Sequence, residues 1–165
     1  MFAVRSRRPV TGLTAAAAAV LAAAGFVLPR AVAPADTDET KVVTWVAEKE
    51  ADTEPHHVRL GDQWVTYLRL HESHGGRAGR VIGDGSARCG AVAVTARGAI
   101  TQCQRVLRAH DGTLALSGMI DRFGPGPYVG RSAVVGGTGV YEGAGGQAEI
   151  TLDGDHVRFR VHLDD

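Results

Sequence analysis

The stretch Ala133–Leu152, AVVGGTGVYEGAGGQAEITL, decides how this chain folds. Two runs of apolar and β-branched residues flank a segment that holds six glycines and one aromatic residue, Tyr141. Glycines this dense exclude a helix, because each glycine inside a helix costs about 1 kcal/mol relative to alanine. A flexible linker is also disfavoured, since Tyr141 sits in the middle of the glycines and a strand pattern resumes directly after them. The stretch therefore predicts a tight corner between two strands of a small barrel, with Tyr141 as its plug.

The remainder of the chain shows further strand patterns separated by turns. Residues 63–72 and 156–163 alternate most clearly, and no amphipathic helix follows the N-terminal segment. The faces predicted to point inward on these two strands carry Trp64, Thr66, Leu68 and Leu70, and Val157, Phe159, Val161 and Leu163. Seven or eight strands at hairpin spacing favour an antiparallel all-β fold, and an up-and-down barrel would remove its exposed edges. A β-sandwich is the alternative.

Three connections between these strands are expected to be irregular. Residues 48–57 are highly charged, residues 73–86 are rich in glycine, and residues 121–131 combine glycine and proline. We expect a charged loop, a connection with little room for regular structure, and a long loop, respectively.

The N-terminus is typical of a secretory signal peptide. Arg5, Arg7 and Arg8 precede an uncharged, alanine-rich run, and Ala33 and Ala35 have the spacing of a cleavage site. The apolar run is shorter than the roughly 20 residues of a membrane span, although an uncleaved anchor remains the alternative. The predicted organisation is a signal peptide over residues 1–35, a mature N-terminal segment with the first strand over 36–57, and the barrel over 58–165. The protein is thus expected outside the cell, with no stable membrane span after cleavage.

Charge argues against a nucleic-acid partner. The full chain has 18 basic and 18 acidic residues, and the predicted signal peptide contains four arginines and no acidic residue. The mature chain would therefore carry a net charge of −4, the opposite of what a nucleic-acid-binding protein needs.

The two cysteines, Cys89 and Cys103, are predicted to form a disulfide. Their midpoint lies within the segment Ala96–Ala99, which resembles a hairpin turn, so the two would face each other on paired strands. A redox-active or metal-binding pair is the alternative, although no CxxC spacing supports it. The histidines do not suggest a metal site either, because adjacent residues such as His56 and His57 point to opposite sides of an extended chain.

The motifs around the corner resemble a known family. The strand at 112–118, GTLALSG, and the corner at 136–146, GGTGVYEGAGG, are similar to the allene oxide cyclase-like and dirigent-like barrel superfamily. The resemblance covers about residues 58–163 and implies a small eight-stranded antiparallel up-and-down barrel with an apolar lumen, often trimeric in plants. It also implies that a hydrophobic small molecule is held in a reactive shape, with no cofactor. No catalytic residue of the family can be matched to a position in this chain.

Candidate ligand-binding residues follow from the inward faces and from two amides. Trp64, Leu68, Leu116 and Phe159 are expected to line the lumen or, alternatively, to pack as core. Gln102 and Gln104 share a face with apolar residues and would bind a carbonyl or hydroxyl if they point inward; an outward, solvated face is the alternative.

Three functions remain open at this stage. The resemblance favours an isomerase or cyclase that steers the intramolecular cyclisation of a bound molecule. The alternatives are an extracellular ligand-binding barrel without catalysis and a structural barrel with a filled lumen. A homo-oligomer is also expected from the resemblance.

Overall fold

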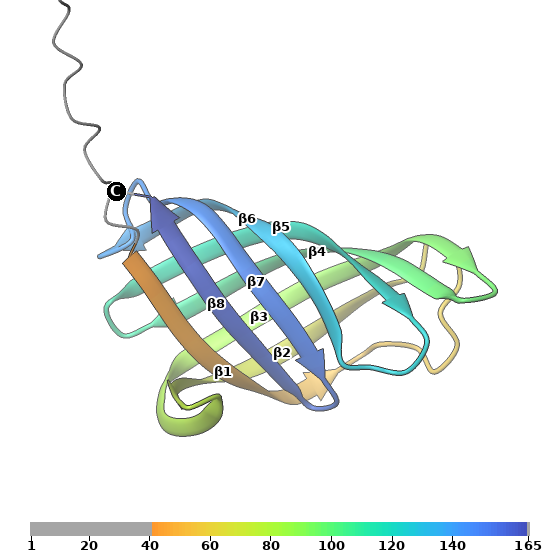
Figure 1. Cartoon of the computed structure of the whole chain (residues 1–165), viewed down its shortest axis with the longest axis horizontal. Helices are drawn as coiled ribbons and strands as arrows, with labels where there is room; N and C mark the ends of the chain where they lie inside the picture. Colours follow the sequence, from red (N-terminus) through yellow and green to blue (C-terminus); the bar gives the residue numbers. More distant parts are fainter. Residues whose placement is uncertain (1–40, 165) are drawn as a thin grey trace, which may run out of the picture. The chain divides into compact units, whose positions relative to one another are not determined.

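The computed structural model describes residues 41–164, which form one closed antiparallel barrel (Figure 1). Each strand pairs with the next in the chain, and the first pairs with the last. The strands are β1 (Lys41–Asp52), β2 (Gln63–His74), β3 (Arg77–Thr95), β4 (Gly98–Ala109), β5 (Gly112–Phe123), β6 (Tyr128–Gly139), β7 (Gly145–Asp153) and β8 (His156–Asp164). The predicted eight-stranded up-and-down barrel is confirmed. The predicted signal peptide over residues 1–35 lies outside the described residues.

The alternation of the strands sorts side chains between the inside and the outside of the barrel. The inward residues predicted on β2 and β8 are all buried, while Val65 and Tyr67 on β2 are exposed. Between residues 41 and 164 there is no helix long and apolar enough to cross a membrane.

The prediction for residues 73–86 is wrong. Most of this region belongs to β3, the longest strand, and only Gly75 and Gly76 form the turn before it, both with positive φ. Gly83 and Gly85 within β3 serve a close approach to β4 rather than a loop. A Cβ at Gly83 would collide with the Arg108 carbonyl oxygen on β4.

Two other predicted loops are shorter than expected. β1 extends through residues 48–52 because its backbone ladder with β2 continues, so that Asp52 lies opposite Thr66. β5 ends at Phe123 and β6 begins at Tyr128, which leaves only residues 124–127 as a loop. Charged and glycine-rich sequence misled the prediction here, because strand pairing continues beyond the apolar core.

The glycine-rich corner connects β6 and β7 as predicted. Tyr141 is 4% exposed and packs edge-to-face on Trp45, with 5.8 Å between ring centroids. Gly137 makes room for it, since a Cβ there would lie 2.7 Å from the Cβ of Tyr141. Gly139 has φ +66° and turns the chain at the end of β6. Tyr141 is therefore the plug of the corner.

The barrel interior has two different ends. The packed end, near the β2–β3, β4–β5 and β6–β7 connections, is filled by large apolar side chains that include Trp45, Leu70, Leu107, Leu114, Tyr141, Phe159 and Val161. The cavity end lies near the β1–β2, β3–β4, β5–β6 and β7–β8 connections, and its smaller core cluster contains Trp64, Ala87, Cys89, Ala91 and Cys103. The candidate site is at the cavity end.

Candidate functional site

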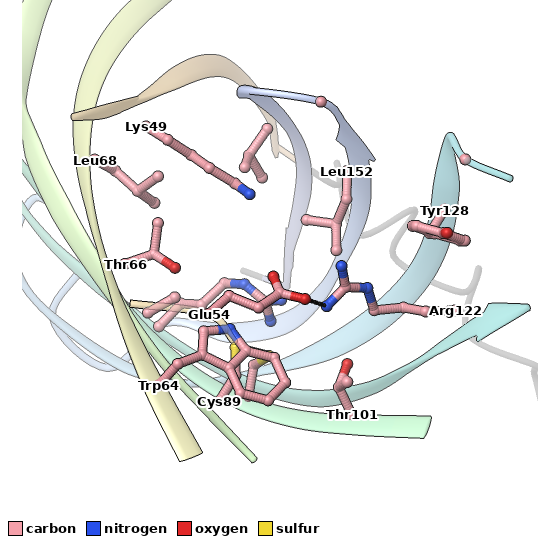
Figure 2. A pocket seen from close by; sticks show the side chains of 16 residues that line it. Lys49, Glu54, Trp64, Thr66, Leu68, Cys89, Thr101, Arg122, Tyr128 and Leu152 are labelled. Atoms are coloured by element: carbon pink, nitrogen blue, oxygen red, sulfur yellow. Dashed lines mark hydrogen bonds and ion pairs between the residues drawn. A yellow bond between two sulfur atoms is a disulfide. The ribbon is translucent and has the colours of Figure 1, made fainter. Parts of the chain in front are cut away.

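A cavity of about 290 Å³ opens at the cavity end of the barrel (Figure 2). Strands supply most of its wall, and three of the connections contribute Glu54, Gly126 and Gly154. The other lining residues are Lys49, Trp64, Thr66, Leu68, Ala87, Cys89, Thr101, Cys103, Arg105, Arg122, Tyr128, Leu152 and Val157.

The space exists because two neighbouring strands carry small inward side chains at this end. These are Ala87 and Cys89 on β3 and Thr101 and Cys103 on β4. On β4 the inward face changes to Leu107 at the packed end. Packing at this end therefore stops short of filling the lumen.

The disulfide between Cys89 and Cys103 is part of the cavity wall. The two residues are direct partners in the β3–β4 register, and their Cα atoms are 4.1 Å apart. The predicted disulfide is confirmed. It ties together the two strands that also carry Ala87 and Arg105 into the wall.

Arg105 is the unusual group of this wall. Its side chain lies on the inward face of β4, and the residue is 3% exposed. Its direct strand partners are Ala87 and Leu116, neither of which carries a charge. No described residue, from 41 to 164, hydrogen-bonds to its Nη1 atom or forms an ion pair with it. Burial lowers the pKa of Arg105 to about 10, so the guanidinium stays charged near neutral pH.

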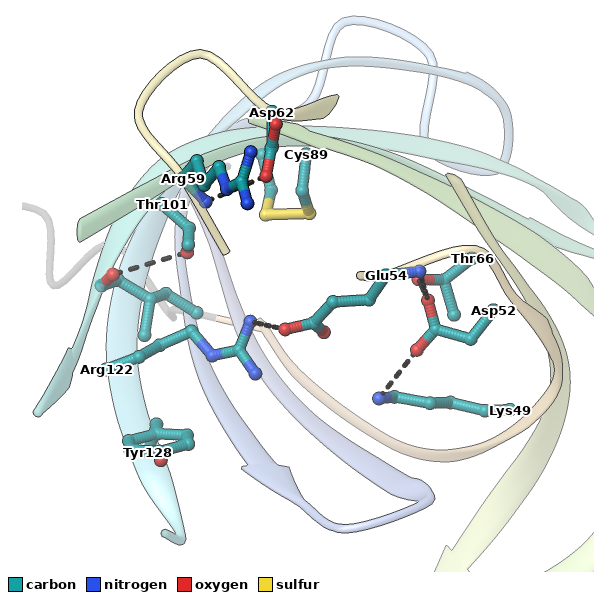
Figure 3. Close-up of polar contacts among 12 residues, drawn as sticks. Lys49, Asp52, Glu54, Arg59, Asp62, Thr66, Cys89, Thr101, Arg122 and Tyr128 are labelled. Carbon is teal, nitrogen blue, oxygen red and sulfur yellow. Dashed lines mark hydrogen bonds and ion pairs between the residues drawn. A yellow bond between two sulfur atoms is a disulfide. The ribbon is translucent and has the colours of Figure 1, made fainter. Parts of the chain in front are cut away.

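An ion pair lies at the mouth of the cavity. Glu54, in the β1–β2 connection, accepts a hydrogen bond of 2.5 Å from Arg122 near the end of β5 (Figures 2 and 3). Both side chains are largely buried, 19% and 22% exposed. The Arg122 guanidinium lies 5.4 Å from the centre of the Tyr128 ring, and the Tyr128 hydroxyl donates to the Gly124 carbonyl. These contacts hold the β1–β2 and β5–β6 connections together across 68 residues of sequence.

Lys49 and Asp52 form a second ion pair at the cavity wall. The Lys49 ammonium lies 2.9 Å from Asp52, and Asp52 accepts a further hydrogen bond from the Thr66 hydroxyl (Figure 3). Burial raises the pKa of Asp52, but the hydrogen bond from Lys49, the backbone N–H of Glu54 and the Lys49 charge outweigh it and hold that pKa below its ordinary value. The carboxylate therefore stays ionised and keeps Lys49 in place.

This arrangement suits an apolar molecule that carries or develops negative charge. Trp64, Leu68, Leu152 and Val157 supply apolar surface. Lys49 and Arg122 are paired with carboxylates, so Arg105 supplies the positive charge that no carboxylate within residues 41–164 offsets. Fixed cations in a site with little water stabilise a developing oxyanion more strongly than they would in bulk solvent. Across residues 41–164 no three histidine, cysteine or acidic side chains gather in a way that would hold a metal ion.

The predicted ligand-binding residues fall into three groups. Trp64 and Leu68 line the cavity. Leu116 and Phe159 are fully buried in the apolar core and are not part of the cavity wall. Gln102 and Gln104 point outward from β4 and flank a shallow groove on the outer face, so the solvated-face alternative describes their position. Whether any of them binds a ligand stays a prediction.

Sequence reasoning missed the charged residues of the wall. Lys49, Glu54 and Arg122 lay in segments expected to be loops, so their direction could not be assigned. The direction of Arg105 could have been predicted, because it alternates with Cys103 and Leu107 along β4 and therefore faces the same side of the sheet. A predicted inward disulfide at Cys103 would have placed Arg105 inside as well.

Comparison with solved structures identifies the architecture. The barrel superimposes on pyocyanin demethylase with a TM-score of 0.61 at 17% identity, over 74% of this chain and 99% of that one. It superimposes on a pterocarpan synthase dirigent protein with a TM-score of 0.56 at 13% identity, over 76% and 84% of the two chains. The fold is that of the allene oxide cyclase/dirigent-like barrels.

A third barrel of this group is a nonspecific heme-binding cyclase that catalyses a cycloaddition in neoabyssomicin biosynthesis. Its TM-score to this chain is 0.54 at 19% identity, over 76% of this chain and 64% of that one. No protein-family model matches the sequence, and no curated protein is similar to it. At these identities the likeness establishes the allene oxide cyclase/dirigent-like fold and confirms the resemblance drawn from the corner motif.

Proposed function

We propose that this barrel binds a small, mainly apolar molecule in the cavity at its open end. The observation that carries the proposal is the cavity itself, about 290 Å³ in volume, inside a barrel whose opposite end is packed solid. Ligand sites are typically concave, mostly apolar and equipped with a few polar groups that orient the ligand. This volume is near the lower end of the range for such sites, which favours a ligand of one or two rings or an equivalent chain.

The structural neighbours support a small-molecule ligand by their names. One is a demethylase of pyocyanin, one a pterocarpan synthase, and one a cyclase that binds heme. All three names describe small organic compounds handled by proteins with this barrel. The support is limited to the class of ligand, because fold alone does not carry an activity.

Steering of an intramolecular cyclisation is the finer proposal. A confined lumen with apolar surface restricts the shapes of a flexible ligand, which is a proximity and orientation effect. Arg105, the cation of the wall that no carboxylate within residues 41–164 pairs with, would add electrostatic stabilisation of an enolate-like transition state. Binding without turnover is the second candidate, and the two differ only in whether product accumulates.

We also propose that the protein acts outside the cell. The disulfide supports this, because such bonds persist in oxidising compartments. The signal-like sequence of residues 1–35 supports it independently.

The test compares a substitution that fills the cavity with one on the outer face. Ala87 is buried on the cavity wall, whereas Ala133 is exposed on the outside of β6. We expect Ala87→Phe to abolish binding of the neutral probe 2-naphthylmethanol and Ala133→Phe to leave it unchanged. Isothermal titration calorimetry measures both, and circular dichroism checks that the variants fold. If Ala87→Phe does not fold, Leu152→Trp fills the cavity from a half-buried position.

Two results would overturn the binding proposal. One is a folded cavity-filled variant that binds the probe as tightly as the wild type. The other is native mass spectrometry of the secreted protein that finds no co-purified small molecule, together with no binding of apolar probes by the wild type.

A further inference from the structure

We propose that the cavity ligand carries an anionic oxygen group, a carboxylate or an enolate, and that Arg105 is the residue that binds it. This inference rests on the proposed function and specifies the chemical class of the ligand. It follows from three observations: the burial of Arg105, its lack of a counter-charge, and its position at the floor of the cavity.

The first step is the cost of the buried charge. A charged group removed from water is strongly unfavourable unless it is paired and hydrogen-bonded. Arg105 is 3% exposed, and its strand partners Ala87 and Leu116 offer no acceptor side chain. Within the described residues its Nη1 atom has no hydrogen-bond partner. An arginine of this kind is expected where a bound anion completes its pairing.

The second step is the charge balance of the cavity wall. Lys49 is paired with Asp52, and Arg122 is paired with Glu54. Arg105 is the remaining cation of this wall, and no carboxylate within residues 41–164 pairs with it. The wall and its paired carboxylates therefore carry one uncompensated positive charge, which matches a ligand with a single negative charge.

The third step is the place of Arg105 along the barrel. The inward residues of β4 run from Thr101 through Cys103 and Arg105 to Leu107, which belongs to the packed end. Arg105 is thus the last polar inward residue of β4 before the apolar core. The anionic group would enter first and lie on the cavity floor, with the apolar body extending toward Trp64 and Leu152 on the wall. A planar guanidinium binds carboxylate oxygens through two parallel hydrogen bonds, which also orients the ligand.

The experiment uses two probes with the same aromatic body, one with an anionic carboxylate and one with a neutral hydroxymethyl group. The probes are 2-naphthoate and 2-naphthylmethanol, which share one apolar body, and the readout is calorimetric titration of the secreted protein. We expect the wild type to bind 2-naphthoate at least tenfold more tightly. Arg105→Met should remove this preference while keeping the affinity for the alcohol, and Arg105→Lys should retain part of it.

A matched control removes a positive charge elsewhere. Arg131 is exposed on the outside of β6, so Arg131→Met changes net charge by the same amount without touching the cavity. It should leave the preference for 2-naphthoate intact. Arg105→Met should also raise the Tm, because it replaces an unpaired buried charge with an apolar side chain of similar length. A fall in the Tm of Arg105→Met, together with loss of its binding to both probes, would show that Arg105 has a structural role and overturn the inference.

The outcomes separate this inference from the proposed function. Equal binding of both probes by the wild type, abolished by the cavity-filled variant, would keep the binding function and overturn the anionic ligand. A preference for 2-naphthoate that survives in Arg105→Met would overturn the role of Arg105. Inorganic phosphate that competes as well as 2-naphthoate would indicate a simple anion site and also overturn the inference. Failure of the wild type to bind either probe, together with the absence of a co-purified small molecule, would refute the proposed function itself.

Discussion

The two ends of the barrel interior are built from the same strands but differ in the size and charge of their inward side chains. At the packed end, inward positions are large and apolar, and Tyr141 closes the corner over Trp45. At the cavity end, the inward residues of β3 and β4 are mostly small, charged side chains join the wall, and the lumen stays open. The difference shows that a closed sheet can concentrate its stability at one end. The other end is then free to hold groups, such as Arg105, that weaken the folded state.

The largest expected difference in stability comes from replacing a leucine by alanine at each end of the barrel. Leu114→Ala removes a 0% exposed side chain from the packed end and should lower the free energy of unfolding by about 3 to 4 kcal/mol. Leu152→Ala truncates a half-buried side chain beside the cavity, where no new void is created, and should cost about 1 kcal/mol. Denaturant unfolding measures both values. Equal costs would contradict the division between the two ends.

The disulfide should be the main source of stability at the cavity end. Replacing both Cys89 and Cys103 by alanine should cost about 3 kcal/mol, because the bond closes a loop with a sequence separation of 14 residues. Guanidinium unfolding of the wild type with and without reductant should show the same loss, whereas reductant should not affect the double variant. An unchanged midpoint after reduction would show that the packed end alone sustains the barrel.

Substituting a glycine at each end should give a smaller difference in the free energy of unfolding. Gly139 and Gly124 both have positive φ, +66° and +68°. A Cβ at Gly139 would also collide with the Asp111 carbonyl oxygen, whereas the space around Gly124 is open. Gly139→Ala should therefore cost about 2 kcal/mol or more, and Gly124→Ala about 1 kcal/mol from its backbone conformation alone.

Thermal unfolding of these two variants tests the corner directly. If Gly139→Ala is as mild as Gly124→Ala, the corner tolerates crowding and its glycines are not required for closure. If both are severe, the cavity-end connection is as tightly constrained as the corner.

The sequence predicted most of the framework because the relevant signals are local. Strand alternation has a period of two residues, so the inward faces of β2 and β8 followed from a few neighbouring side chains. The hairpin that carries the disulfide followed from the symmetric spacing of Cys89 and Cys103 about its turn. The dense glycines around Tyr141 predicted the corner, since few other structures accommodate them.

Predictions failed where composition and pairing disagree. Residues 73–86 are rich in glycine, yet most of them form β3, where Gly83 and Gly85 let β3 and β4 approach closely. Residues 48–52 are charged, yet they extend β1, because a backbone ladder does not require apolar side chains. The second error hid Lys49, a wall residue of the cavity, since a residue assigned to a loop has no predictable direction.

The sequence by itself determined an antiparallel all-β chain of seven or eight strands, the direction of its clearest strands, the disulfide and the plugged corner. These depend on interactions between residues close in the chain or on strict alternation, whereas the count of eight strands in a barrel was implied by the resemblance of the corner motif to a known family. Only the tertiary structure decided that one end is filled and the other open, because that depends on the summed volume of side chains from all eight strands. The same is true of the pairing of Glu54 with Arg122 and of the isolation of Arg105. Glu54 and Arg122 lie far apart in the sequence, and the burial of Arg105 without a partner among residues 41–164 depends on the strands that close around it.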